Sequence, residues 1–197
     1  SVSERTLAIV KQEVSKVIPN EKDMPPQLVL ASLDCNFATG TLGTEDYMNK
    51  IGNYLDSIDS SDELKSKYYI KLGRILKKER EETSEESIQE ILSYYEKACK
   101  HNKDNYKAWH HLGLMNFEAV EYYSNLNEKS YKKAIHTHVI ASLKGLIKAI
   151  SLGSSTMANS KSLQDTLRVL TLWFKYGDHP ETEKILQDSF KTIDLVS

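Results

Sequence analysis

The sequence predicts an all-α protein whose helices stack as an α-solenoid. Apolar residues recur at the 3.6-residue spacing of amphipathic helices, and most of the 8 glycines and 4 prolines lie between these periodic segments. The second observation is internal similarity between segments about 40 residues apart, which favours stacked repeats over a closed bundle. Both observations indicate repeated helix-turn-helix units.

Nine amphipathic helices are expected, with bounds set by turn and cap residues. In chain order they are expected over residues 3–18, 27–39, 45–58, 63–78, 87–101 and 105–125, then in a helix ending near Leu152, and within residues 162–176 and 181–193. The charged run KKEREETSEES, residues 77–87, is interpreted as a solvated loop between the fourth and fifth helices.

The eighth helix is expected within SLQDTLRVLTLWFKYGDHPE, residues 162–181. Ser162 with Asp165 forms a variant of the capping box, Gly177 suits the end of a helix, and Pro180 suits the start of the next. Asp165 and Arg168 are expected off the apolar face. The apolar face is predicted to point to the core and consists of Leu163, Leu167, Leu170 and Phe174.

Two motifs repeat along the chain. Tyr69-x-x-Leu72-Gly73 is echoed by Trp109-x-x-Leu112-Gly113, 40 residues later, and Tyr94-Tyr95-Glu-Lys-Ala98 is partly echoed by Tyr131-Lys-Lys-Ala134, 36 residues later. An aromatic residue, Leu-Gly and then Lys-Ala on the partner helix form the tetratricopeptide pattern, with small residues where paired helices approach closely. The period is long and irregular, so the repeats are interpreted as degenerate.

The composition narrows the classes of partner. The chain has 26 basic and 28 acidic residues, a net charge of −2, which gives no global attraction to nucleic acid or to an anionic membrane. No apolar run is long enough to span a bilayer, and no signal peptide is evident, so a soluble intracellular protein is expected. Cys35 and Cys99 lack paired spacing and are expected to be reduced, half-buried helix residues.

No catalytic motif is present in the sequence. Nucleotide-binding glycine loops, nucleophile elbows, zinc-protease motifs and kinase motifs are all missing. Paired acids such as Glu81 and Glu82 lie in a polar run that offers no burial to raise a carboxyl pKa. The six histidines lack the spacing of a helical zinc site. No catalytic residue and no metal ligand is therefore assigned to this chain.

Three lysines form the candidate ligand site. Lys67 and Lys71 are spaced i, i+4 on the fourth helix, and Lys107 lies in the first turn of the sixth. Equivalent helices of successive repeats stand side by side, so these ammonium groups could converge in a groove and meet several phosphates of one ligand. Spacing alone also fits the simpler alternative of solvated surface lysines.

Residues 64–194 resemble the FAT region of the TOR (target of rapamycin) family, phosphatidylinositol-3-kinase-related serine/threonine protein kinases. The resemblance depends on KYYIKLG, on YYEKACKHNKDNYKAWHHLGLMNFEAVEYY, and on KAISL followed by SLQDTLRVLTLWFKYGDHPE. It implies a solenoid of tetratricopeptide-like and HEAT-like repeats over residues 62–197. Residues 1–61 show a compatible helical pattern and are expected to be N-terminal repeats of the same solenoid.

The resemblance implies a non-catalytic clamp or scaffold that restrains and regulates a kinase domain in nutrient and growth signalling. ATP binding and phosphoryl transfer belong to that kinase domain. The implied partners are the kinase domain, other parts of the parent kinase and TOR complex subunits, without nucleic acid or direct membrane insertion. The implied locations are the cytoplasm, the nucleus, and endolysosomal or vacuolar membranes reached through complex partners.

The family also binds inositol hexakisphosphate in a basic FAT pocket, and its lining residues correspond to Lys67, Lys71 and Lys107. Departures from the family pattern include Ile75 and Leu112 in place of two tryptophans, and a short segment after Tyr123. Relatives continue past KTID, whereas this chain ends at LVS. A fragment, a truncated gene model or a stand-alone copy is therefore expected. The alternative function is an autonomous tetratricopeptide-like adaptor that binds a protein partner.

Overall fold

The computed structural model describes residues 9, 24–59, 61–80, 82–126, 129–153 and 163–171, and within these ranges it is helical and has no strand. The predicted all-α fold is confirmed. The chain divides into two compact units, Ser1–Ser61 and Asp62–Ser197. The predicted helices over residues 3–18 and 181–193 lie outside the described residues, apart from residue 9, which is helical.

The first unit contains α2 (Pro26–Ala38) and α3 (Thr44–Ser57). Gly40, with φ of 73°, supplies the left-handed residue after α2 that other residues adopt only with strain. The Phe37 and Tyr47 rings stack with centroids 4.4 Å apart, and the Tyr47 hydroxyl donates to Asp34 Oδ1 at 2.6 Å. The fully buried side chains of this unit are Leu30, Tyr47, Ile51 and Leu55.

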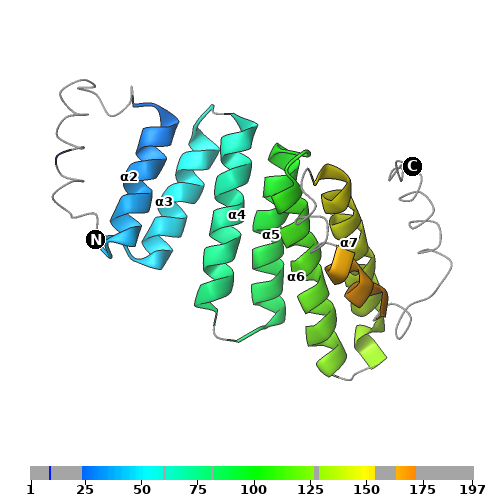
Figure 1. Cartoon of the computed structure of the whole chain (residues 1–197). Coiled ribbons are helices and arrows are strands. Elements are labelled where there is room, and N and C mark those ends of the chain that lie inside the picture. Colours follow the sequence, from blue (N-terminus) through cyan, green and yellow to red (C-terminus); the bar gives the residue numbers. More distant parts are fainter. Residues whose placement is uncertain are drawn as a thin grey trace. The chain divides into compact units, whose positions relative to one another are not determined.

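The second unit contains two antiparallel helix pairs, α4 (Asp62–Glu79) with α5 (Glu85–His101) and α6 (Tyr106–Asn125) with α7 (Lys132–Leu152). A short 3₁₀ turn, η2 (Lys129–Tyr131), precedes α7, and residues 163–171 are helical. The four long helices stand next to one another in chain order (Figure 1). The bounds of α2 to α6, and the end of α7, agree with the predicted ones within two residues.

The first helices of the two pairs, α4 and α6, lie parallel and in contact. The Asn105 side-chain amide, at the start of α6, donates to Ser66 Oγ at 3.0 Å. Lys77, near the end of α4, forms an ion pair with Glu118 of α6. These contacts join residues 39 and 41 positions apart, close to the predicted offset of 40. The pairs are therefore stacked as successive repeats.

The two Leu-Gly motifs lie where paired helices approach closely, as predicted. A Cβ atom added to Gly73 would lie 2.6 Å from Cε1 of Tyr95 on α5. One added to Gly113 would lie 2.8 Å from Cγ and 2.9 Å from the backbone nitrogen of Leu146 on α7. Gly145 makes the reciprocal approach, because its added Cβ would lie 2.9 Å from Gly113 Cα. Both helix pairs require the absence of a side chain at these positions.

The second predicted echo is wrong in register. Ala98 lies near the end of α5, whereas Ala134 lies in the first turn of α7. The position equivalent to Ala98 is Ala149, because Tyr95 and Leu146 cover the equivalent glycines of the two pairs and both alanines lie three residues further on. Ala98 and Ala149 are both buried. The second pair has longer helices, so the offset between second helices is 51 rather than 36.

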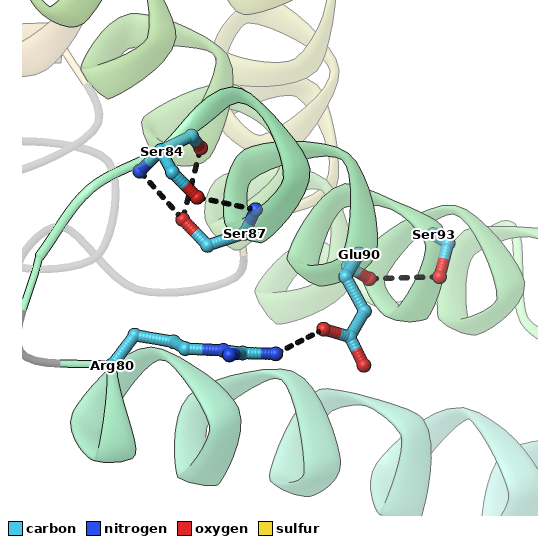
Figure 2. Close-up of polar contacts among 5 residues, drawn as sticks. All are labelled: Arg80, Ser84, Ser87, Glu90 and Ser93. Atoms are coloured by element: carbon cyan, nitrogen blue, oxygen red, sulfur yellow. Dashed lines mark hydrogen bonds and ion pairs between the residues drawn. The ribbon is translucent and has the colours of Figure 1, made fainter.

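The charged run over residues 77–87 is mostly helical rather than a loop. Lys77 and Lys78 lie in the last turn of α4, and Glu85 and Glu86 in the first turn of α5, where each sign of charge favours the helix dipole. Residues 80–84 connect α4 to α5. Arg80 and Ser84, at the two ends of this connection, are labelled in Figure 2. These residues are helical rather than part of a loop because their charges stabilise the helix ends.

A serine capping box starts α5 (Figure 2). The Ser87 N–H donates to Ser84 Oγ at 3.1 Å, and the Ser84 N–H donates to Ser87 Oγ at 2.9 Å. The guanidinium of Arg80 pairs with Glu90 Oε2 at 2.8 Å across the connection. These contacts fix the angle at which the chain enters α5.

Two of the three described residues of the predicted apolar stripe of the eighth helix face solvent. Leu163 and Leu167 are 53% and 57% exposed, and Leu170 is half-buried, whereas Thr166 and Val169 are buried. The polar residues expected off the core face make the contacts with α6. Asp165 Oδ2 lies 3.2 Å from His110 Nε2, and Arg168 stacks over the Phe117 ring at 5.0 Å. Phe174, Ser162 and Gly177 lie outside the described residues.

Candidate functional site

The three candidate lysines lie on the first helices of the two pairs. Lys67 is exposed on α4, and Lys71, one turn further on, is half-buried with its Nζ 5.7 Å from the centroid of the Tyr68 ring. Lys107 is exposed in the first turn of α6. The Lys107 N–H donates to the N-cap side chain, Asn105 Oδ1, at 3.1 Å, so the cap fixes this turn.

The Ser66–Asn105 hydrogen bond brings two of these lysine turns together. Ser66 precedes Lys67 in the second turn of α4, and Asn105 is the N-cap two residues before Lys107, so the second turn of α4 lies beside the start of α6. The end of α5 closes the same end of the unit, because His101 Nδ1 lies 2.8 Å from Asp62 Oδ1. The site therefore combines two helix starts and one helix end.

The charge of this end of the unit is partly uncompensated. Lys67 and Lys107 make no ion pair with the part of the chain that the structure describes. Asp62, the first residue of α4, is engaged with His101. Helix starts add positive potential through their unpaired N–H groups. Asp62 and Glu63 place negative charge in the first turn of α4, so the exposed positive charge at this end comes from Lys67 and Lys107.

Arg74 extends the basic face of α4 and was missed by the sequence analysis. It is exposed and lies three residues after Lys71 and seven after Lys67, on the same side of the helix. The Arg74 charge also acts on the Tyr95 hydroxyl. Burial and the Glu118 charge raise the pKa of this hydroxyl to about 12, and the Arg74 charge lowers it in part. The i+3, i+7 spacing was the signal that could have identified it.

Three of the described histidines in the second unit stack on tyrosine rings. His101 stacks on Tyr69 and His111 stacks on Tyr95, with centroids 5.5 Å and 5.3 Å apart. His138 lies 5.5 Å from Tyr123, and its Nδ1 is 2.8 Å from Asn116 Oδ1. Within the described ranges, no group of three histidine, cysteine, aspartate or glutamate residues could hold a metal ion.

The two cysteines carry unpaired thiols. Cys35 is half-buried, as predicted, whereas Cys99 is buried rather than half-buried. Burial, with a contribution from the Glu96 charge, raises the pKa of the Cys99 thiol to about 12. The thiolate is the nucleophilic form, so Cys99 is a packing residue rather than a reactive one.

None of the helices in the described ranges is long and apolar enough to cross a membrane.

Comparison with known proteins identifies the family. A model of the FAT domain matches residues 2–171. The serine/threonine-protein kinase tor1 of Schizosaccharomyces pombe is 31% identical over 150 residues, 75% of this chain and 6% of that protein. The serine/threonine-protein kinase TOR of Oryza sativa subsp. japonica is 28% identical over 189 residues, 86% of this chain and 8% of that protein.

A third relative gives the same result. The serine/threonine-protein kinase mTor of Drosophila melanogaster is 29% identical over 149 residues, 67% of this chain. The chain thus spans 6% to 8% of the length of these three kinases. The match to the family model begins at residue 2. It therefore includes the N-terminal region, which the sequence motifs over residues 64–194 did not cover. The chain belongs to the FAT domain family, and its relatives are TOR-type serine/threonine protein kinases.

Proposed function

We propose that this chain is a non-catalytic FAT segment of a TOR-type serine/threonine protein kinase, which clamps and regulates the kinase domain in nutrient and growth signalling. The observation that carries the proposal is the FAT match over residues 2–171, combined with relatives that are kinases more than ten times longer. ATP binding and phosphoryl transfer belong to the kinase domain of such a protein, and this segment supplies packing surfaces.

The packing of the second unit supports a mechanical role. Gly113 and Gly145 allow the backbones of α6 and α7 to approach closely, and the contacts Ser66–Asn105 and Lys77–Glu118 join α4 to α6 near both ends. Close-packed interfaces of this kind resist continuous deformation, so the helix pairs move as a unit. Such a unit can hold a neighbouring domain in a restrained geometry.

The partners that follow from this role are the kinase domain, other parts of the parent kinase and TOR complex subunits. We expect the parent protein in the cytoplasm and the nucleus, and at endolysosomal or vacuolar membranes through its complex partners. Sequencing the transcript beyond residue 197 tests the parentage. A downstream kinase domain would support the proposal, and a stop without one would favour the autonomous adaptor.

The regulatory role is tested in the full-length kinase that carries this segment. Gly113→Ala is expected to loosen the α6–α7 interface and to change the basal rate of substrate phosphorylation. Gly52→Ala in α3 is the matched control, because a Cβ added at Gly52 meets no atom within 4 Å. Equal rates in the two variants, with Gly113→Ala measurably destabilised, would contradict the clamp.

We also propose that Lys67, Lys71 and Lys107 bind an inositol polyphosphate such as inositol hexakisphosphate. Support comes from the Ser66–Asn105 contact, which places the second turn of α4 beside the start of α6, and from the exposure of Lys67 and Lys107. Several ammonium groups at one end of a helical unit suit a ligand with several phosphates.

Calorimetry with inositol hexakisphosphate tests the lysine site in the 197-residue chain. Lys67→Glu and Lys107→Glu are each expected to weaken binding by about tenfold or more, because each removes one attraction and adds one repulsion. Lys133→Glu, exposed in the first turn of α7, carries the same charge change at the opposite end of the α6–α7 pair. Loss of binding in that control, or unchanged binding in both site variants, would remove the site as drawn.

A further inference from the structure

A cleft of about 320 Å³ lies between α5 and α6, apart from the three candidate lysines. Three charged residues line it, Glu96, Lys100 and Lys103, together with Cys99, Trp109 and Leu112. The indole N–H of Trp109 donates to the carbonyl oxygen of Lys103 at 2.8 Å, which ties the turn between the helices to the first turns of α6. We name it the Trp109 cleft.

Comparison with the preceding repeat shows that apolar surface is left uncovered here. Trp109 and Leu112 occupy the positions of Tyr69 and Leu72, which are 2% and 0% exposed. The Tyr69 ring is covered by the stacked His101 ring. Trp109 and Leu112 are only half-buried, and they form part of the cleft wall. Among the residues that the structure describes, no ring covers Trp109 as His101 covers Tyr69, so the wall is open to an external apolar group.

The basic residues of the cleft are also uncommitted. Lys97, one turn before Lys100, lies over the rings of Tyr69 and Tyr94. By contrast, Lys100 and Lys103 are exposed and make no ion pair or cation–π contact with the described part of the chain. Glu96 supplies one negative charge, so the charged residues of the lining sum to +1. The cleft offers two free cations beside an apolar wall.

This combination discriminates between classes of occupant. Two lysines are too few for a polyphosphate or a nucleic acid, whose affinity comes from many phosphate contacts. The volume is at the lower end of ligand pockets and suits one large side chain. Acidic residues on either side of that side chain would complement Lys100 and Lys103. A short peptide segment supplies both features at once.

We propose that the Trp109 cleft binds an acidic segment of a partner protein, with one bulky apolar side chain against Trp109 and Leu112 and neighbouring carboxylates paired with Lys100 and Lys103. The proposal adds a docking surface to the clamp and does not depend on the inositol polyphosphate site. The affinity comes from burial of the apolar anchor, and the lysines select the sign of the flanking charges.

Fluorescence anisotropy with labelled synthetic peptides tests the proposal on the 197-residue chain. The probe DEDFDED is expected to bind, DEDGDED to bind about tenfold more weakly because it lacks the anchor, and KKKFKKK not to bind. The double variant Lys100→Glu/Lys103→Glu is expected to weaken DEDFDED binding by about tenfold or more. Trp109→Phe, which keeps an aromatic ring and removes the indole N–H, is expected to weaken it less. Lys133→Glu, in the first turn of α7 at the opposite end of the α6–α7 pair, should leave binding unchanged.

Two results would overturn the proposal. Unchanged binding of DEDFDED by the double lysine variant, with its helical content intact by circular dichroism, would remove the lysines from the site. Equal binding of DEDFDED and DEDGDED would show attraction of charge alone, without use of the apolar wall. Lys67→Glu separates this site from the inositol polyphosphate site, because it should weaken inositol hexakisphosphate binding and leave DEDFDED binding intact.

Discussion

The two helix pairs of the second unit use the same Leu-Gly motif against different kinds of surface. In the first pair, Gly73 faces the ring of Tyr95, which can rotate or shift by a small amount. In the second pair, Gly113 faces the backbone of α7 at Gly145 and Leu146. A backbone contact cannot relax without moving a whole helix. The difference indicates that the second pair is the more constrained interface, although the motif in the sequence is identical.

The largest predicted effect is the loss of stability in Gly113→Ala. An added Cβ would lie 2.9 Å from the Leu146 backbone nitrogen, so α7 must move, and Ser142 Oγ, which donates to the Gly113 carbonyl at 2.7 Å, moves with it. Overpacking of this kind should lower the free energy of unfolding by about 2–3 kcal/mol, after allowing for the better helix propensity of alanine. Urea unfolding measures it, with Gly52→Ala as the control that should be neutral or stabilising.

Gly73→Ala is predicted to cost less, about 1 kcal/mol. The clash is with the Tyr95 ring, which is 1% exposed and must shift within the core, while the helix backbones can stay in place. The same urea experiment compares the two glycines directly. A loss for Gly73→Ala as large as that for Gly113→Ala would show that the two interfaces are equally rigid.

The starts of α5 and α7 differ as well. Ser84 and Ser87 form the capping box of α5, whereas the N-cap of α7, Tyr131, makes no side-chain cap hydrogen bond. Ser84→Ala should lower the free energy of unfolding by about 1 kcal/mol, because it leaves the Ser87 N–H without its acceptor. Ser93→Ala, in the middle of the exposed face of α5, should cost nothing or stabilise slightly. A smaller loss for Ser84→Ala than for Ser93→Ala would contradict the cap (Figure 2).

A smaller and pH-dependent effect is predicted for the second pair alone. Burial lowers the pKa of His138 below its usual 6.5, and the Glu85 charge opposes this only in part. The unfolded chain therefore takes up a proton first as the pH falls through about 6.5, so the stability that neutral His138 contributes is present above that pH and is lost below it.

Unfolding midpoints measured at about pH 7.5 and about pH 5.5 test this prediction. The original chain should lose more stability between the two values than His138→Asn, whose side-chain amide nitrogen takes the place of Nδ1 and can donate to Asn116 Oδ1. Equal losses in the two proteins would show that His138 titrates in the folded state as it does in the unfolded state.

Much of the fold could be predicted from the sequence, because local signals and packing agree. The Leu-Gly motifs, for example, were predicted where paired helices approach closely, and both glycines lie at such positions. The residue of α7 that is equivalent to Ala98 could not be predicted. The match to Ala134 was based on residue types alone and did not allow for the longer helices of the second pair. Ala149 becomes the equivalent residue only when the contacts of the glycines are known.

The orientation of the eighth helix and the Trp109 cleft show where pattern alone fails. Leu163 and Leu167 fit a core stripe, yet the contacts of Asp165 with His110 and of Arg168 with Phe117 turn another face towards α6. Helical spacing identifies an apolar face but not the polar contacts that compete with it. The lysine site is a prediction from i, i+4 spacing. The cleft depends on the partial exposure of Trp109, which has no signal in the sequence.

The most direct test of the clamp is the basal kinase rate of the full-length parent protein, measured for Gly52→Ala, Gly73→Ala and Gly113→Ala together. If the solenoid restrains the kinase domain through its packing, the rate should depart from the original enzyme in the order of lost stability, least for Gly52→Ala and most for Gly113→Ala. Rates that are the same in all three variants, while their unfolding free energies differ as predicted, would contradict a regulatory role for this segment.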